Sequence, residues 1–492
     1  MSEIYDVVVL GNASSGLALA LQLKRDDPSL SVALVGPKDR SGAASLAAGA
    51  MINVYAEIGE GTFEDPDLKS RFGLVEPAMR YWDDHAAFLR ETSGLAFDVQ
   101  WGTYVIQNAK STPIEMRIYD YMSKAVKDLG VEHREVNPLD IPYLRPTDGH
   151  QAYKAMWLPD GRFDPVKAIA ASEVSARNLG VDIFEQRAVS LSVRERKSLI
   201  MRASDTKKVS LEDGTVLKSA NLVFANGAFA QELIDLDSEL KSETPRLLYG
   251  AGAALDVSIP DWVDDMGGVG KTLSGMDHVV RTTDRGGSCG NHIVPLGDGR
   301  FYSGASSAVW LEPDGRARVG GIHVNIHALI NEFNLEFFYG CVSVRQNGYR
   351  PTTADCYPLL GESHLNGVWF MNGMKRDGFT SSPYLADQLS KAIRGEQHEL
   401  PERFKPSRKL ISYKRKDQAI LATQQFYRGA DSQHGNSVAP YLSDIYEDAR
   451  FAPIEKVYES RDIEQFGIHP ELIHLYQNDK FYQQIKHSRE LV

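Results

Sequence analysis

Cysteine is scarce in this chain, with 3 residues in 492. Cys289, Cys341 and Cys356 form no C-x-x-C pair, so neither a disulfide framework nor a thiolate metal site is expected. Long apolar runs are missing as well, and no stretch is long enough to span a bilayer. An apolar segment begins within a few residues of Met1, so no signal peptide is expected. A reducing cytoplasm is therefore the expected compartment.

The chain also has fewer basic than acidic residues. The chain has 54 Lys and Arg against 66 Asp and Glu, a formal net charge of −12. This balance argues against nucleic acid or an anionic membrane as the main partner. Any anionic ligand must be held by local arginines. Hydrophobic residues at 42% and charged residues at 24% are typical of a globular protein, and the length predicts two or more domains.

The N-terminus has the pattern of a nucleotide-binding β-α-β unit. An apolar run at Tyr5–Leu10 predicts a buried parallel strand, and Leu17–Lys24 continues with helical periodicity. The turn between them reads G-x-A-x-x-G from Gly11 to Gly16, with Ala13 in place of the middle glycine. Ser14 and Ser15 are additional candidate phosphate donors. A turn of this kind after a strand favours a dinucleotide, because a helix N-terminus supplies N–H donors to a pyrophosphate. A tight turn without a ligand is the alternative.

One element of the dinucleotide pattern is absent. A second strand is expected at Ser31–Val35, and an acidic residue should follow it to hold ribose hydroxyls. Gly36 and Pro37 stand there, with Asp39 or Ser41 as candidate substitutes. This departure favours a buried flavin dinucleotide, which has many other contacts, over an exchanging nicotinamide.

Further elements follow from periodicity and turn residues. A long helix is expected near 65–91, a strand at 97–106, and a helix from Pro165 through Ser175. Strands are expected at 181–193 and 222–225, and glycine-broken strands of an antiparallel sheet between about 247 and 326. The segment 401–492 holds 12 Tyr or Phe residues and is expected to fold against the main body or a second subunit. Within it, 436–440 is expected to be a loop and 470–491 an amphipathic helix.

Two arginine-containing blocks lie near the end of the main body. Gly348–Gly361 contains Arg350 followed by Pro351, and Asn372–Phe379 contains Arg376 ahead of glycine. Proline restricts the preceding residue to extended backbone, which pre-organises the Arg350 side chain. The pattern predicts two fixed cations in one pocket and hence a substrate with an anionic group.

Together these segments resemble the D-amino-acid oxidase/glycine oxidase superfamily of FAD-dependent oxidoreductases. The resemblance spans about 4–395 in the family's block order. It rests on the N-terminal turn, the small-residue segment Ala43–Met51, the segment Leu222–Leu233 and the arginine blocks. Residues 291–295 and 299–305 also resemble the family's substrate-domain hairpin.

The resemblance implies an α/β fold with a Rossmann-like FAD-binding domain, a mixed or antiparallel substrate domain and an additional C-terminal extension. The implied FAD-binding segments are 1–75, 160–245 and 340–398, the substrate-binding segments are 76–159 and 246–339, and the extension is 399–492. FAD is expected to be non-covalent, because nothing suitable for covalent attachment stands near Gly348. The residues expected at the cofactor are Gly11, Ala13, Ser14, Ser15, Gly16, Ser45, Ala48, Gly49, Met51, Val189, Asn226, Gly227, Gly373, Arg376, Asp377 and Gly378.

The resemblance assigns the catalytic roles to the two arginines. Arg350 is expected to hold the substrate carboxylate through two parallel hydrogen bonds. The alternative is a structural arginine paired with Asp355. Arg376 is expected near the substrate or the pyrimidine edge of the flavin, where a cation favours hydride acceptance. Lys375 either shares that role or is solvated.

The other polar candidates for the substrate pocket are less central to the predicted function. Tyr55, His292 and Tyr349 are pocket candidates, and a satisfied histidine on a sheet is the alternative for His292. Glu57 either faces the substrate or only packs. His469 and His474 are five residues apart, off the spacing of a single helix face, and no metal role is expected for them.

The sequence therefore supports three hypotheses about function. The first is FAD-dependent oxidation of the C–N bond of an amino acid or carboxylate-bearing amine, with flavin reoxidised by O2 to give H2O2. The second is a pathway-specific dehydrogenase acting on a modified or carrier-bound amino acid. The third, prompted by Ala13 and the missing acidic residue, is a dinucleotide-binding scaffold that has lost catalysis. A homo-oligomer is compatible with each.

Overall fold

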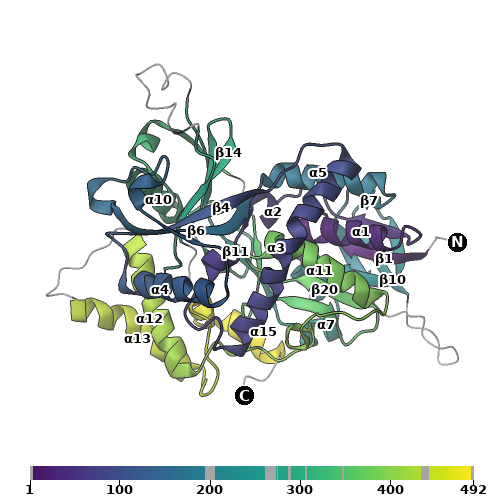
Figure 1. The fold of residues 1–492 in the computed structure, drawn as a ribbon. Helices are drawn as coiled ribbons and strands as arrows, with labels where there is room; N and C mark the ends of the chain where they lie inside the picture. Colours follow the sequence, from purple (N-terminus) through teal and green to yellow (C-terminus); the bar gives the residue numbers. More distant parts are fainter. Residues whose placement is uncertain are drawn as a thin grey trace.

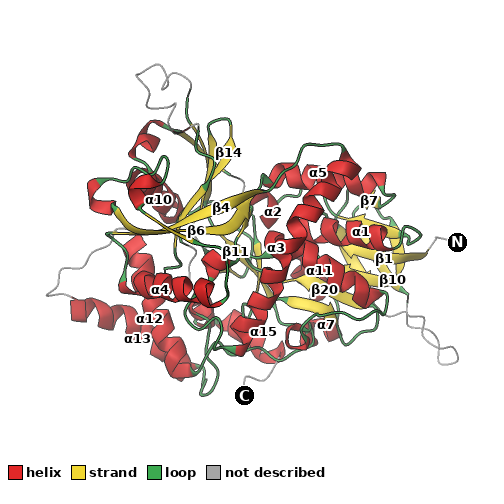
Figure 2. Ribbon diagram, viewed as in Figure 1, coloured by secondary structure: helices red, strands yellow, loops and turns green. Residues whose placement is uncertain are grey.

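The computed structural model describes residues 4–193, 206–260, 273, 275–285, 290–304, 307–345, 348–433 and 443–488. In Figure 1 the chain forms two adjoining regions, one around β1, β10 and β20 and the other around β4, β6 and β14. The C-terminal segment runs along the lower side of both. The strands accordingly gather in two places in Figure 2, with helices outside them.

The first region is built on a largely parallel sheet in the order β19-β20-β10-β1-β2-β7, with β9 and β8 continuing from β10. β1, β2, β7, β10 and β20 pair in parallel, whereas β19 and β9 are antiparallel to their neighbours. The inner strands are apolar and fully buried, as expected where helices cover both faces. The strand bounds are β1 Ile4–Leu10, β2 Val32–Val35, β7 Asp182–Phe184, β8 Ala188–Ser192, β9 Lys207–Leu211, β10 Val216–Phe224, β19 Leu359–Glu362 and β20 Val368–Asn372.

Helices pack on this sheet and against one another. α1 (Ser14–Asp26) contacts α11 (Gly378–Ile393) and α5 (Pro165–Asn178), and α3 (Pro66–Ser93) contacts both α11 and α5. α3 and α5 each begin with an aspartate N-cap followed by proline, a combination that starts helices sharply. Shorter helices complete the region: α2 Ala44–Ala47, η1 Tyr55–Glu57, η4 Gly227–Phe229, α6 Ala230–Ile234 and α7 Ser238–Glu243.

The second region contains a large mixed sheet in the order β17-β12-β15-β14-β13-β4-β6-β3, with β5 paired to β6. Most of its pairs are antiparallel, and β13 runs parallel to β4. Its strands are β3 Met51–Ile52, β4 Gln100–Asn108, β5 Arg134–Val136, β6 Ala152–Arg162, β12 Ala254–Ser258, β13 Val279–Thr282, β14 His292–Gly297, β15 Arg300–Gly304 and β17 Cys341–Val344. The helical elements around it are α4 Pro113–Asp128, η2 Pro138–Asp140, η3 Asp148–His150, α10 Val319–His327, η5 Ala328–Phe333 and η6 Leu335–Tyr339.

A three-stranded sheet, β16-β11-β18, connects the main body to the C-terminal extension. Its strands are β11 Leu247–Ala251, β16 Ala308–Trp310 and β18 Arg350–Thr353. Leu248, Val309 and Ala354 are buried in one apolar cluster with side chains such as Ile454 and Tyr476 of the extension. The extension is therefore folded on the main body. It contains η7 Glu402–Phe404, α12 Lys416–Gln433, α13 Ser443–Ser460, η9 Pro470–Leu472, α14 Ile473–Tyr476 and α15 Asp479–Ser488.

Several expected elements are confirmed, and three need correction. The N-terminal β-α-β unit, the long helix near 65–91 and the hairpin β14–β15 are present. Residues 181–193 form two short strands instead of one, and 319–326 lie in helix α10 instead of a strand. The expected helix 470–491 is divided, because Asn478 begins a new helix by accepting a hydrogen bond from the Phe481 N–H. The expected loop at 436–440 lies outside the described residues.

No helix in the described part of the chain combines the length and the apolar character needed to cross a membrane.

Candidate active site

One large cavity, of about 270 Å³, lies between the parallel sheet and the other two sheets. Its wall includes the turn after β1, the start of α1, the segment leading to β3, the turn after β10, parts of β14 and β15, and the starts of β18 and α11. The two arginine blocks meet in this wall, where the Lys375 N–H donates to the Pro351 carbonyl at 3.0 Å. Arg350 and Arg376 thus line one cavity, although 26 positions separate them in the sequence.

The nucleotide turn presents an open helix end to the cavity. Ala13 is the N-cap residue of α1 and makes no side-chain cap hydrogen bond, and no acidic residue stands in the first turn. Ala13, Ser14 and Ser15 line the cavity. Gly11 has φ +109, and a Cβ there would lie 2.4 Å from the Ala225 carbonyl oxygen, so only glycine fits this close approach. The Ser14 N–H donates to Ser45 Oγ at 3.3 Å, and the helix dipole and the other N–H groups of the first turn suit a phosphate group.

The absence of an acidic residue at the end of β2 has a structural reason. A Cβ on Gly36 would lie 2.4 Å from Asn12 Oδ1, and Asn12 Nδ2 donates to the Pro37 carbonyl at 3.0 Å. The Asn12 side chain therefore occupies the space beside the strand end. Ser41 and Arg40 line the cavity there, with Arg40 ion-paired to Glu173, whereas Asp39 accepts the Ser41 N–H and stays outside the wall.

Most of the residues expected at the cofactor lie in the cavity wall. The lining residues among them are Gly11, Ala13, Ser14, Ser15, Ser45, Ala48, Gly49, Met51, Asn226, Gly227, Arg376, Asp377 and Gly378. Gly16, Val189 and Gly373 are not part of it. Gly16 allows α1 to begin against the Gly11 carbonyl, and Val189 is 49% exposed while its neighbours Arg187 and Ala188 line the cavity.

The wall has features that fit a large polar cofactor. The side-chain oxygens of Asn53 and Asn226 are buried and have no hydrogen-bond partner among the described residues. Buried polar atoms are normally satisfied, so two such atoms in a cavity indicate a ligand with matching donors. FAD carries hydroxyl donors as well as phosphates, and it fits both the asparagines and the open helix end.

Arg350 begins β18, the strand that pairs with β11 in the register Gly250↔Arg350. The preceding Tyr349 is packed between the rings of Phe229 and Tyr249, with centroids 5.8 and 5.5 Å away. The alternative prediction for Arg350, a structural ion pair with Asp355, is wrong. The Asp355 carboxylate is held by Arg408 of the extension at 2.9 Å, and it also accepts hydrogen bonds from Thr353 and Ile411.

Lys375 is not solvated, which corrects one of the two interpretations of this residue. Its side chain is 2% exposed, and its Nζ lies 2.7 Å from Oε1 of Glu471 in the extension. The neighbouring Arg376 has Nη2 3.9 Å from Glu471 and 4.0 Å from Asp284. Sequence reasoning missed Glu471 because no local motif marks it.

The Glu57 carboxylate lines the cavity. Its Oε1 lies 2.7 Å from Nη1 of Arg281, a side chain with no exposed surface. Burial alone would raise the pKa of Glu57, but Arg281, Arg376 and Arg71 outweigh burial and lower it to about 2. Glu57 is therefore ionised across the working range of pH. Tyr55 points elsewhere: it is buried near Phe72, with ring centroids 6.5 Å apart, and does not line the cavity.

His292 lines the cavity from β14 and stacks on Tyr302 at 5.8 Å. Its Nδ1 donates to the Gly290 carbonyl at 3.1 Å, which leaves Nε2 as an acceptor. Burial, together with the charge of Arg281, lowers the pKa of His292 to about 3. His292 is therefore neutral and adds no positive charge to the wall.

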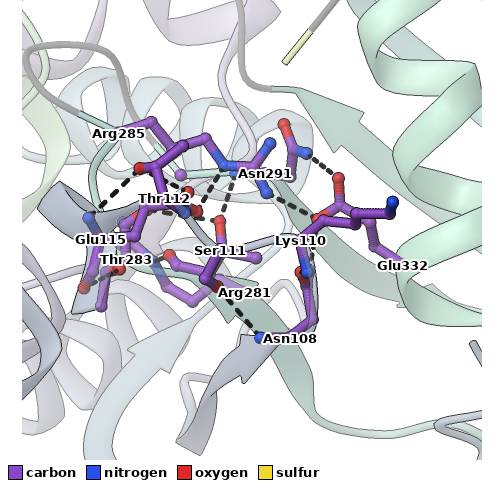
Figure 3. Close-up of polar contacts among 12 residues, drawn as sticks. Asn108, Lys110, Ser111, Thr112, Glu115, Arg281, Thr283, Arg285, Asn291 and Glu332 are labelled. Carbon is purple, nitrogen blue, oxygen red and sulfur yellow. Dashed lines mark hydrogen bonds and ion pairs between the residues drawn. The ribbon is translucent and has the colours of Figure 1, made fainter. Parts of the chain in front are cut away.

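A buried polar network stands behind this part of the wall (Figure 3). Arg285 lies between two carboxylates, 2.8 Å from Glu115 and 2.7 Å from Glu332. Asn291, next to His292, donates to Glu332 at 2.8 Å. The network fixes the start of β14 and with it the position of His292.

Residues 6–392 match the family model of the DAO family, described as FAD dependent oxidoreductase. The chain belongs to this family. It is an enzyme, and FAD is its cofactor. The family resemblance seen in the sequence is thereby confirmed, and the scaffold hypothesis is wrong.

Among curated proteins, the chain is 25% identical over 421 residues to the bifunctional protein ThiO/ThiG of Synechocystis sp. (strain ATCC 27184 / PCC 6803 / Kazusa). That match covers 84% of this chain and 55% of the relative, so the chain spans about half the length of the curated relatives it matches.

Among solved structures, the glycine oxidase from Geobacillus kaustophilus aligns with a TM-score of 0.68 and 19% identity, covering 83% of this chain and 100% of that one. The iminodiacetate oxidase from Chelativorans sp. BNC1 aligns with a TM-score of 0.65 and 20% identity, covering 81% and 98%. These likenesses establish the fold.

The two histidines of the extension are hydrogen-bonded within the fold. His469 Nδ1 accepts the Glu471 N–H, and His474 donates to the Val309 carbonyl at 2.8 Å, so both histidines have structural roles. Of the described cysteines, Cys341 is exposed and Cys356 is buried, and neither lines the cavity.

The domain boundaries, the oligomeric state and the cytoplasmic location stay predictions.

Proposed function

We propose that this enzyme oxidises the C–N bond of an amino acid or of another amine that carries a carboxylate. The observation that carries the proposal is the position of Arg350 and Arg376 in the wall of the cavity that also contains the nucleotide turn. A carboxylate held by a guanidinium there is fixed within the same cavity as the cofactor. Such positioning is the main contribution of a protein when the cofactor supplies the chemistry.

The proposal assigns the cofactor contacts to the residues described above. The start of α1 would hold the pyrophosphate of FAD, and the buried amide oxygens of Asn53 and Asn226 would accept hydrogen bonds from its donors. FAD supplies the hydride acceptor at its N5 position. The chain contributes a second open helix end at α11, whose first residues Gly378, Phe379 and Thr380 line the cavity. Its dipole favours negative charge nearby.

Arg350 binds the substrate carboxylate through two charge-assisted hydrogen bonds, and Pro351 keeps its backbone extended. Arg376 adds a second positive charge beside the substrate or the reduced cofactor. His292 is neutral and has an acceptor at Nε2, which suits it to receive an N–H of the neutral amine. The apolar faces of Met51 and Tyr349 exclude water from the reacting carbon.

The overall reaction is balanced with water and oxygen. The amine loses a hydride and a proton to become an imine, and water adds to the imine to release an oxo acid and ammonia or a smaller amine. O2 takes up the two electrons and two protons to give H2O2. The names of the relatives support this class, because glycine oxidase and iminodiacetate oxidase are oxidases of carboxylate-bearing amines.

A dehydrogenase that acts on a modified or carrier-bound amino acid is the second candidate. The observation that favours it is the extension, which lies beyond the matched residues 6–392 and contributes Glu471 beside the cavity. Turnover of an N-substituted or carrier-bound amino acid, with free amino acids inert, favours this candidate. Release of H2O2 from a free amino acid favours the first.

Replacing Arg350 tests the proposed role directly. In Arg350→Ala, acetate, used as a carboxylate probe, should bind the FAD-loaded enzyme about 100-fold more weakly, because two charged hydrogen bonds are lost. The measurement is the shift of the flavin absorbance on titration with acetate. Arg300→Ala, at an exposed position on β15, serves as the matched control and should bind acetate normally. Equal acetate affinity in Arg350→Ala and Arg300→Ala would show that Arg350 does not hold the carboxylate.

A further inference from the structure

The extension places one charged residue directly behind the wall of the cavity, in contact with the lining residue Lys375. Glu471 lies in η9, is 4% exposed, and its Oε1 contacts Lys375 Nζ at 2.7 Å. Both side chains of this pair are 2% exposed, so neither charge is solvated. Lys375 lines the cavity in a left-handed backbone conformation, with φ 54, between Pro351 and Arg376.

The surroundings of Glu471 hold it in place as an anion. Its Oε2 accepts from Ser307 Oγ at 3.2 Å, and its backbone N–H donates to His469 Nδ1 at 3.2 Å. Burial alone would raise the pKa of Glu471, but Lys375 and Arg376 outweigh burial and lower it to about 2. Burial lowers the pKa of His469 well below its usual value, so this histidine is neutral and does not compete for the carboxylate.

The Glu471 carboxylate therefore neutralises the charge of Lys375 inside the protein. An unbalanced lysine in this wall would add one positive charge next to Arg376 and near Arg350. Buried charges interact strongly because little water screens them, and one uncompensated charge changes the affinity of every anion in the cavity. Glu471 also lies 3.9 Å from Arg376, so it draws this second cation toward the extension.

We propose that Glu471 is a positioning residue that sets the charge of the cavity and restricts it to substrates with a single carboxylate. The proposal rests on the proposed function, since it concerns the charge of the substrate bound at the same site. It assigns the extension a part in substrate selection, because Glu471 lies outside the residues 6–392 shared with the family.

The test compares a monoanion with a dianion on the FAD-loaded enzyme. Isothermal titration measures the affinities for acetate and malonate, and the readout is the ratio of malonate affinity to acetate affinity. In Glu471→Gln the ratio should rise roughly tenfold, because the second carboxylate of malonate meets an uncompensated Lys375. In Lys375→Met the ratio should fall, because the negative charge of Glu471 behind the wall then has no lysine to balance it.

Two further variants complete the design. Glu464→Gln changes an exposed glutamate of the same segment and should keep the ratio of the unmodified enzyme. The double variant Lys375→Met with Glu471→Gln removes both charges and should return the ratio to that of the unmodified enzyme. A change in thermal stability, followed on the same samples, reports the structural contribution of the pair separately from the ratio.

The outcomes separate the two proposals. A ratio that stays constant in Glu471→Gln or in Lys375→Met, even with both affinities reduced, overturns the role of Glu471 and leaves the proposed function intact. If the FAD-loaded unmodified enzyme binds neither acetate nor malonate, the carboxylate pocket itself is wrong and the inference fails with it.

Discussion

At the scale of residues, several charged side chains in and behind the cavity wall are held in close pairs. Arg281 contacts Glu57, Lys375 contacts Glu471, and Arg71 contacts Asp377, each at 2.7 Å. Pairing is needed because an isolated buried charge costs several kcal/mol. The pairs also fix the side chains, so the cavity is pre-organised before a ligand binds.

His292 makes the stability of the protein depend on pH. Its pKa falls from an ordinary value of 6.5 to about 3 on folding, so the unfolded chain binds a proton more readily. The contribution of His292 is complete above pH 6.5 and declines as the pH drops toward 3. At pH 5 the deficit is about 2 kcal/mol, at roughly 1.4 kcal/mol for each pH unit below 6.5.

Urea unfolding of the FAD-loaded protein at pH 7 and pH 5 measures this effect. The variant His292→Gln should lose about 2 kcal/mol less than the unmodified protein between the two pH values. His398→Gln, at an exposed position, is the control and should lose as much as the unmodified protein. An identical pH dependence in His292→Gln and His398→Gln would contradict the buried neutral histidine.

At the scale of elements, the buried network of Figure 3 connects α4, η5 and the start of β14. Glu115 closes a capping box at the start of α4 by accepting from the Thr112 N–H at 2.7 Å. The same carboxylate pairs with Arg285, which in turn contacts Glu332 of η5. The three charges are almost fully buried, so the arginine is the balancing cation for two carboxylates.

Arg285→Met should destabilise the protein by about 3–5 kcal/mol, because it leaves two buried carboxylates without their cation. The matched control is Arg316→Met, which removes an ion pair with Asp314 in which the arginine is 83% exposed. That change should cost about 0–1 kcal/mol. Chemical denaturation of both variants makes the comparison, and a cost below about 1 kcal/mol for Arg285→Met would show that the network does not hold the fold.

Elements that are marked by a short sequence pattern were predicted correctly. The apolar run of β1, the glycine turn before α1 and the proline after Arg350 each act within a few residues, and each prediction of their structure is confirmed. The break before α15 could also have been predicted, because Asn478-Asp479 is a helix-start signal. The amphipathic pattern of 470–491 favoured one continuous helix instead.

Long-range partners could not be predicted in this way. Lys375 and Glu471 are 96 residues apart, and Asp355 and Arg408 are 53 apart, so no spacing rule connects them. Helix α10 contains β-branched residues that favour a strand, but Asn325 donates to the Ala253 carbonyl at 2.9 Å and the helix packs on β12. Tertiary packing outweighs local propensity there.

At the scale of the whole molecule, three parts meet at one cavity. The parallel sheet contributes the nucleotide turn, the large sheet contributes His292 and Tyr302, and the three-stranded sheet contributes Arg350. The extension covers the three-stranded sheet and reaches the cavity wall through Glu471. The lining of this cavity therefore comes from all three sheets, as expected of an enzyme that holds a cofactor and a substrate together.

Anaerobic titration of the FAD-loaded enzyme is the decisive measurement of whether it oxidises carboxylate-bearing amines. The panel contains D-, L- and N-alkyl amino acids, together with amines that match them except for the carboxylate, such as methylamine beside glycine. At least one amino acid should bleach the flavin absorbance, while its carboxylate-free counterpart should leave the absorbance unchanged. Equal bleaching by the carboxylate-free amines, or no bleaching by any member of the panel, would contradict the proposed function.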